Sequence, residues 1–295
     1  MTTTGTAPGS RGFFYAISGL AAVRLIINAV ILVAAYIGLE VLGLWAVQLA
    51  APLDRQWAML GAALTLSAVM IGIYKLLVRM MERRAATEIR FAPGLAFKGA
   101  VFGFILFCAL YAALELLGYA RWNGFSGYGG VITALAIAIA SGVGEETAFR
   151  GGIFRVLEDS FGTGLAIAVS AVLFGLLHAA NNGATVFSTA AIAWEAGVLL
   201  GACYAASGNL WLPIGLHFGW NFTEGGVFGA AVSGHNYQAL FKFSLSGPDL
   251  MTGGAFGPEA SIIALVISGV PSLALIILTI RRGRWKPLDF RMRLN

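Results

Sequence analysis

Residues 131–158 read VITALAIAIASGVGEETAFRGGIFRVLE, an apolar run that leads into two adjacent glutamates, Glu145 and Glu146. At about 1.5 Å per residue, a helix of this length crosses the hydrocarbon core of a bilayer. A carboxylate at that depth costs about 2.5–3.5 kcal/mol on insertion scales, so it faces a bundle interior or a wet cavity. The segment therefore predicts a membrane helix that carries a polar site.

The composition of the whole chain agrees with a membrane protein. Of its 295 residues 58% are hydrophobic and 11% are charged, and the mean hydropathy is +0.82. A soluble domain carries about 25% charged residues, so this chain cannot cover a water-exposed surface. An ordinary soluble enzyme, a disordered chain and a secreted disulfide scaffold are excluded. Cys108 and Cys203 both lie in apolar segments and are interpreted as packing residues.

Apolar runs separated by Gly, Pro and Asn predict eight spans and a polytopic, all-α integral membrane protein. The spans are expected near 25–50, 57–79, 98–118, 131–158, 162–180, 185–205, 210–231 and 260–281. Residues 233–258 are expected to form a loop. The chain is interpreted as one integral-membrane domain, 1–295.

The basic residues set the expected orientation. With the N-terminus in the cytoplasm and eight spans, the inner side receives 16 of the 19 Lys and Arg, and the outer side receives Arg55, Arg121 and Lys242. Both termini are therefore predicted to be cytoplasmic. Because the basic residues lie at the ends of apolar runs, lipid headgroups explain the net charge of +5 better than nucleic acid does, and no nucleic-acid partner is expected.

The two glutamates of the central span are expected to differ in role. Arg150 follows Glu146 by four residues and shares its helix face. Glu145 projects about 100° away from that face. We expect an internal Glu146–Arg150 ion pair that leaves Glu145 available for chemistry. The alternative is that both carboxylates pair with arginines for structure alone. Most other acidic residues are interpreted as lying near helix ends or in loops.

Two of the three histidines lie in other apolar spans. His178 ends the span 162–180, with Phe174 one turn before it, and His217 is four residues before Asn221. Ionisable groups inside a membrane converge on an interior site, so these side chains are expected to meet Glu145. His235 lies in the predicted outer loop and is expected to be solvated.

These groups suit hydrolysis of a peptide bond. Glu145 can act as the general base on a water that His178 orients, while His217 and Asn221 donate hydrogen bonds to the oxyanion. Alternatively, His178, His217 and Glu145 can hold a metal ion such as zinc. No His-Glu-x-x-His motif is present. The sequence therefore leaves two alternatives for the cofactor, a zinc ion or no cofactor.

At these residues the chain resembles the CAAX prenyl protease and bacteriocin-processing (CPBP) intramembrane proteases. Their Glu-Glu-x-x-x-Arg motif matches residues 145–150, their Phe-x-x-x-His motif matches 174–178, and their His-x-x-x-Asn motif matches 217–221. Each motif alone is weak, whereas three in this order on separate apolar helices are specific.

The resemblance implies a membrane-embedded, glutamate-dependent endopeptidase of about eight helices. Members of this family are often called metalloproteases. The resemblance places a catalytic core that carries the three motifs at 131–224, and it assigns catalysis to Glu145, His178, His217 and Asn221, with Glu146 and Arg150 in support. It implies a membrane-associated peptide or protein substrate, CAAX-like or a leader peptide, and a multi-pass location in a bacterial plasma membrane. Two other functions stay open, a non-catalytic scaffold or immunity-type module of the same fold and a proton-coupled transporter.

Overall fold

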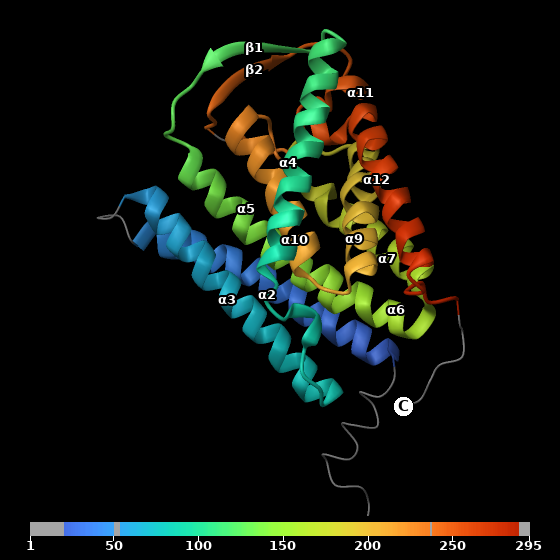
Figure 1. The fold of residues 1–295 in the computed structure, drawn as a ribbon. Coiled ribbons are helices and arrows are strands. Elements are labelled where there is room, and N and C mark those ends of the chain that lie inside the picture. Colours follow the sequence, from blue (N-terminus) through green and yellow to red (C-terminus); the bar gives the residue numbers. More distant parts are fainter. Residues whose placement is uncertain (1–20, 50–53, 237, 289–295) are drawn as a thin grey trace, which may run out of the picture.

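The computed structural model describes residues 21–49, 54–236 and 238–288, and the described chain is mainly helical (Figure 1). Eight helical segments fall where the eight spans are expected. They are α2 (Ala21–Leu49), α3 (Arg55–Glu82), α4 (Pro93–Leu116), α5 to α6 (Val131–Phe161), α7 with its terminal turn (Thr163–Ala180), α8 to α9 (Val186–Ser207), α10 to η5 (Trp211–Phe228) and α12 (Ile262–Arg281).

Seven of these segments are long and apolar enough to cross a membrane. The segment Trp211–Phe228 does not meet that criterion in the described part of the chain. It is an interior helix, because α10 (Trp211–Asn221) packs against α4, α5 and α9 (Leu199–Ser207), and most of its side chains are buried (Figure 1). The chain is therefore a polytopic, all-α membrane protein, as expected.

Large apolar side chains on the outer helices agree with a lipid-facing surface. Trp45 on α2, Leu116 on α4 and Val270 on α12 are 66%, 88% and 70% exposed. In water such a surface would associate, whereas in a bilayer it faces acyl chains. These exposures support the multi-pass assignment.

Glycines allow α4 and α10 to meet backbone to backbone. A Cβ at Gly99 or Gly103 would lie 2.2 Å from a carbonyl oxygen of α10, and one at Gly215 or Gly219 would lie 2.1 Å from a carbonyl oxygen of α4. Side chains larger than hydrogen would force the helices apart. This contact fixes α10, and with it His217, in the interior.

Three of the helical segments contain stretches of π-helix. These stretches are η2 (Thr147–Phe154), η4 (Ala193–Val198) and η5 (Phe222–Phe228). π-Helical turns occur frequently at functional sites, and here η2 follows the Glu145–Glu146 pair directly. The Gly151–Gly152 pair lies inside η2 and does not end the helix.

The expected loop at 233–258 is only partly irregular. Residues Phe241–Leu245 form β2, which pairs antiparallel with β1 (Ala120–Phe125), and Asp249–Thr252 form the short helix α11. The sequence analysis missed both strands, which have only six and five residues; β2 reads FKFSL, and its apolar–polar alternation was an available strand signal. The strands join the loop after α4 to the loop before α12.

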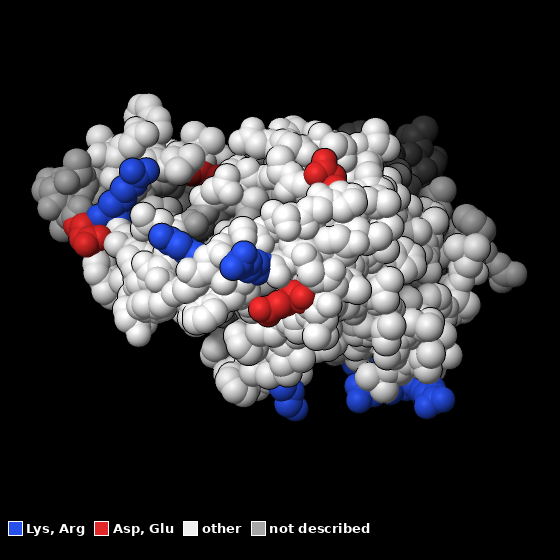
Figure 2. All heavy atoms as spheres, turned by 90° about the horizontal axis from the view of Figure 1, so that it is seen from above, with Lys and Arg blue, Asp and Glu red and all other residues white. Residues whose placement is uncertain are grey.

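Basic residues in the last turns of α3 and α12, such as Arg79 and Arg281, lie at one end of the molecule. The ends of α3 and α12 lie with α6 (Arg155–Phe161) at the end opposite β1 and β2 (Figure 1). There, Lys286 Nζ lies 2.7 Å from Asp159 and 3.4 Å from Glu158. The opposite face carries few charged side chains (Figure 2). This arrangement agrees with an even number of crossings, while the cytoplasmic location of the basic end stays a prediction.

Candidate active site

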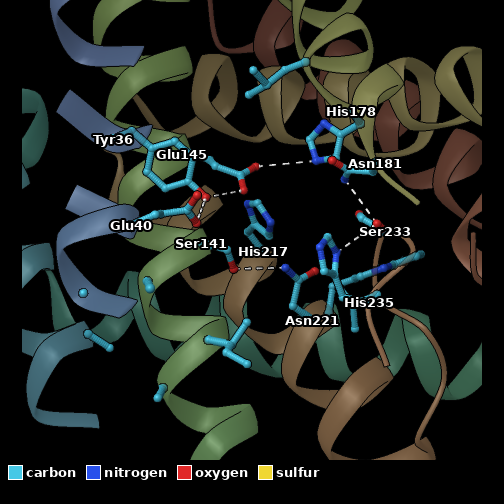
Figure 3. Close-up of a pocket in the computed structure, with 18 of the residues that line it drawn as sticks. Tyr36, Glu40, Ser141, Glu145, His178, Asn181, His217, Asn221, Ser233 and His235 are labelled. Atoms are coloured by element: carbon cyan, nitrogen blue, oxygen red, sulfur yellow. Dashed lines mark hydrogen bonds and ion pairs between the residues drawn. The ribbon is translucent and has the colours of Figure 1, made fainter. Parts of the chain in front are cut away.

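The motif residues converge on one cavity of about 680 Å³. Side chains from α2, α3, α5 (Val131–Glu146), α7 (Thr163–Leu177), η4 and α10 line it, together with the segment 232–235 (Figure 3). The four residues predicted to be catalytic all belong to the lining, namely Glu145, His178, His217 and Asn221. Three separate helical segments therefore bring these side chains together.

Glu145 is buried at the end of α5 with one carboxylate oxygen held. Its Oε1 accepts a hydrogen bond from the Tyr36 hydroxyl at 3.0 Å. Its Oε2 has no hydrogen-bond partner among the described residues and lies 3.9 Å from His178 Nε2. That distance is too long for a direct hydrogen bond. Oε2 is thus the oxygen that is available to a water or a substrate.

His178 is oriented by its own helix. Its Nδ1 lies 2.8 Å from the carbonyl oxygen of Phe174, one turn earlier, and the Phe174 ring packs against the imidazole with centroids 4.8 Å apart. Because a carbonyl oxygen only accepts hydrogen bonds, Nδ1 carries the proton in this contact. The neutral ring therefore presents the lone pair of Nε2 toward Glu145.

Glu146 is committed to a buried network, as the sequence predicts. Its Oε1 pairs with Arg150 at 2.9 Å and with Nδ1 of His217 at 3.0 Å. Arg150 also donates to the carbonyl oxygens of Ala196 and Gly197 at 3.1 Å each. Glu146 and Arg150 are both fully buried. The expected ion pair is present, and it also fixes the ring of His217.

The Phe174 ring connects this network with His178. The guanidinium carbon of Arg150 lies 4.7 Å from the ring centroid, and the ring also contacts His217 edge-on at 6.2 Å. A guanidinium over an aromatic face is a favourable cation–π arrangement. The first residue of the second motif therefore packs against residues of the other two.

Asn221 is held by Ser141, which precedes the glutamate pair by one helical turn. Its Nδ2 donates to Ser141 Oγ at 3.1 Å. The carboxamide nitrogen carries two hydrogens, so one N–H is left for a ligand in the cavity. Figure 3 shows Asn221 on the same side of the cavity as His235.

The three candidate metal ligands, His178, His217 and Glu145, are not arranged around one common point where an ion could bind. Within residues 21–49, 54–236 and 238–288, no three His, Cys, Asp or Glu side chains are grouped so that they could hold one ion. The Nδ1 of His217 faces Glu146, and the Nε2 of His178 lies 3.9 Å from Glu145. As arranged here, these residues do not fit a metal ion that all three would coordinate.

Several carboxylates inside the membrane segments were missed by the sequence analysis. Glu40 and Glu195 line the cavity, and Glu224 is fully buried on η5 with no hydrogen-bond partner in the described part of the chain. The expectation that most acidic residues other than the central pair lie near helix ends or in loops does not extend to these three. Their positions ten or more residues inside apolar runs were the available signal for Glu40 and Glu195.

His235 is exposed, as expected, but it also lines the cavity. Its location on the outer side of the membrane stays a prediction. Its Nδ1 lies 3.1 Å from the Ser233 carbonyl oxygen, which also accepts a hydrogen bond from Asn181. Ser233 in turn donates to Glu259, another lining residue. His235 is thus part of the cavity rim and is not remote from the site.

Comparison with known proteins identifies the central segment. Residues 127–223 match the family model described as type II CAAX prenyl endopeptidase Rce1-like. No curated protein and no solved structure matches the chain. The matched segment contains all three motifs and every residue of the Glu146 network. Residues 127–223 therefore belong to the Rce1-like family of type II CAAX prenyl endopeptidases, in agreement with the CPBP family that the three motifs indicate.

Proposed function

We propose that the chain is an endopeptidase that hydrolyses a peptide bond of a membrane-associated substrate, with Glu145 as general base. One observation carries the proposal. The partnerless Oε2 of Glu145 faces Nε2 of His178 across 3.9 Å at the cavity wall. Glu146 uses its Oε1 for Arg150 and His217, and this glutamate does not line the cavity. The family match to an endopeptidase supports the same reaction class.

The gap between Glu145 and His178 suits one water molecule, because a bridging water can hydrogen bond to two groups that are too far apart to bond directly. Glu145 Oε2 takes one proton from this water, and the oxygen bonds to the carbonyl carbon of the substrate. When the C–N bond breaks, the proton passes from Glu145 to the leaving amine. The carboxylate is then regenerated, and one water has been consumed.

Asn221 and His217 are proposed to stabilise the oxyanion. Asn221 has a second N–H beyond the one given to Ser141. The Nδ1–H of His217 donates to the Glu146 carboxylate. Because a neutral imidazole carries only one N–H, His217 can also donate from Nε2 only as an imidazolium. Donors held in place before reaction are worth about 10²–10³-fold in kcat each.

The apolar wall of the cavity suits a substrate with a lipid or strongly apolar segment. Lining residues from α2 and α3 include Leu44, Val47, Met59 and Leu66. We propose a CAAX-like or leader peptide as substrate, in line with the family description. A bacterial plasma membrane is proposed as the location, on the basis that the flanking helices resemble those of bacterial CPBP members.

The test compares membranes that contain wild-type protein or the Glu145→Gln variant, with new peptide termini identified by mass spectrometry. Glu115→Gln is the matched control, because this exposed glutamate on α4 does not line the cavity. Termini that appear with wild type and Glu115→Gln, and are lost with Glu145→Gln at equal expression, support the proposal. Equal termini in all three samples would overturn it and favour a scaffold or transport role.

A further inference from the structure

The first helix reaches the base of the candidate site. Tyr36 on α2 is 8% exposed, and its hydroxyl oxygen lies 3.0 Å from Glu145 Oε1 and 2.7 Å from Glu40 Oε1. Figure 3 shows Tyr36 and Glu40 on one side of Glu145, with His178 on the other. Helix α2 lies outside residues 127–223, so the family match does not include this contact.

The backbone of α5 is shaped to receive the Tyr36 ring. A Cβ at Gly144 would lie 2.5 Å from both Cδ2 and Cε2 of that ring. Only a glycine at the position before Glu145 allows the ring to lie against the helix there. The close approach is independent of the hydrogen bonds, and it places the hydroxyl at the carboxylate.

The other described groups around Glu145 do not form a hydrogen bond with its Oε1, which is bound by Tyr36. His178, at the end of α7, faces Oε2. Glu146 and His217 bond to each other. Among the described residues, the Tyr36 hydroxyl donates the hydrogen bond that Oε1 of Glu145 accepts. Without the hydroxyl, Oε1 would have no hydrogen-bond partner in the part of the chain that the structure describes.

The Tyr36 hydroxyl cannot serve both carboxylates as a donor at once. A hydroxyl carries a single hydrogen but accepts through two lone pairs. Both short contacts are hydrogen bonds when one carboxyl is protonated and donates to the hydroxyl oxygen. When Glu40 is the carboxyl that carries the proton, its O–H donates to the Tyr36 oxygen, and the hydroxyl hydrogen of Tyr36 is directed at Glu145 Oε1.

We propose that Tyr36 and Glu40 are positioning residues for Glu145, with Tyr36 fixing Oε1 so that Oε2 faces the water and Glu40 orienting the Tyr36 hydroxyl. This inference rests on the proposed endopeptidase function. It adds the first helix to the site and assigns a role to an intramembrane carboxylate that the three motifs do not contain.

The first experiment removes only the hydroxyl. Full-length wild type, Tyr36→Phe and Glu145→Gln are purified and assayed on the peptide whose cleavage depends on Glu145. We expect Tyr36→Phe to lower kcat by about 10- to 100-fold, the range of one hydrogen bond to a charged group, with KM within about twofold because Tyr36 does not bind the peptide. Tyr111→Phe is the matched control, because this buried tyrosine is outside the cavity lining and should keep full activity.

The second experiment asks whether Glu40 acts through Tyr36. Glu40→Ala is expected to lower kcat in the wild-type background and to have no further effect in the Tyr36→Phe background. Glu40→Gln keeps a group that can bond to the hydroxyl and should lose less than Glu40→Ala. Equal losses from Glu40→Ala in both backgrounds would overturn the indirect role.

The two proposals fail in different ways. If Glu145→Gln abolishes cleavage and Tyr36→Phe keeps the full kcat, the positioning role is wrong and the endopeptidase function stands. If Tyr36→Phe raises KM and leaves kcat unchanged, Tyr36 binds substrate and the inference is also wrong. If Glu145→Gln cleaves as wild type does, the proposed function fails, and the positioning role falls with it.

Discussion

Replacing Arg150 with Met should expose how the buried network supports both the fold and His217. Arg150 and Glu146 have 0% exposure and are joined at 2.9 Å. Met has a similar length but no charge, so the Glu146 carboxylate would lose its cationic partner away from water. Removing one member of a buried ion pair costs about 3–5 kcal/mol. At about 2.1 cal/mol/K of unfolding entropy per residue, a chain of this size would lose about 5–8 °C in Tm.

The double variant Glu146→Gln/Arg150→Met separates stability from catalysis. It removes both charges, and neutral replacement of a whole buried pair is often tolerated. Most of the lost Tm should therefore return. Activity should not return, because a carboxamide accepts a hydrogen bond from His217 Nδ1 but cannot balance an imidazolium. The measurements are thermal unfolding in detergent and cleavage of the Glu145-dependent peptide.

Two results would refute this reasoning. If the single Arg150→Met variant is as stable as wild type, the guanidinium is not the partner that makes the buried carboxylate tolerable. If the double variant is as unstable as the single one, the loss comes from the two carbonyl contacts of Arg150 or from packing against Phe174, and the ion pair is not its cause.

Three further changes test other parts of the molecule. Gly219→Val should destabilise the protein by about 1–3 kcal/mol, because a Cβ there would lie 2.1 Å from the Ala100 carbonyl oxygen; an unchanged Tm in detergent would disprove the close packing. Burial raises the pKa of Glu88, but hydrogen bonds from Arg84 and Tyr74 and the charge of Arg155 together outweigh burial and hold the pKa below its ordinary value. Its stabilising effect is therefore present above about pH 4.5 and lost as the pH falls through the lowered pKa, so the Tm difference between wild type and Glu88→Gln should shrink in acid; a difference independent of pH would contradict this. Asn221→Ala should lower kcat by about 10²–10³-fold with little change in KM on the same peptide, and an unchanged kcat would remove Asn221 from the oxyanion site.

The elements that the sequence predicted well are those with a local signal. The eight helical segments follow from apolar runs of about 20 residues, and their bounds agree within a few positions. The Glu146–Arg150 pair follows from i,i+4 spacing. The convergence of His178 on Glu145 follows from the cost of leaving either group in lipid. None of these predictions required knowledge of which helices are neighbours.

The features that the sequence did not predict depend on long-range contacts. Tyr36 and Glu40 share a helix face, but their relevance appears only when α2 lies against α5 at Gly144. The pairing of β1 with β2 joins residues more than 100 positions apart. The position of Trp211–Phe228 inside the bundle depends on α4, whose glycines admit it.

The site is therefore larger than the segment that carries its motifs. Residues 127–223 contain Glu145, His178, His217 and Asn221, but they do not close the cavity. Its walls also come from α2, from α3 and from lining residues such as Ser233 and Glu259, all outside that segment. A motif can place a base and its partners, whereas the contact to Oε1 of that base comes from elsewhere in the chain. Because α2 supplies both this contact and part of the apolar wall, changes in the first helix can alter turnover and substrate preference while all three motifs stay intact.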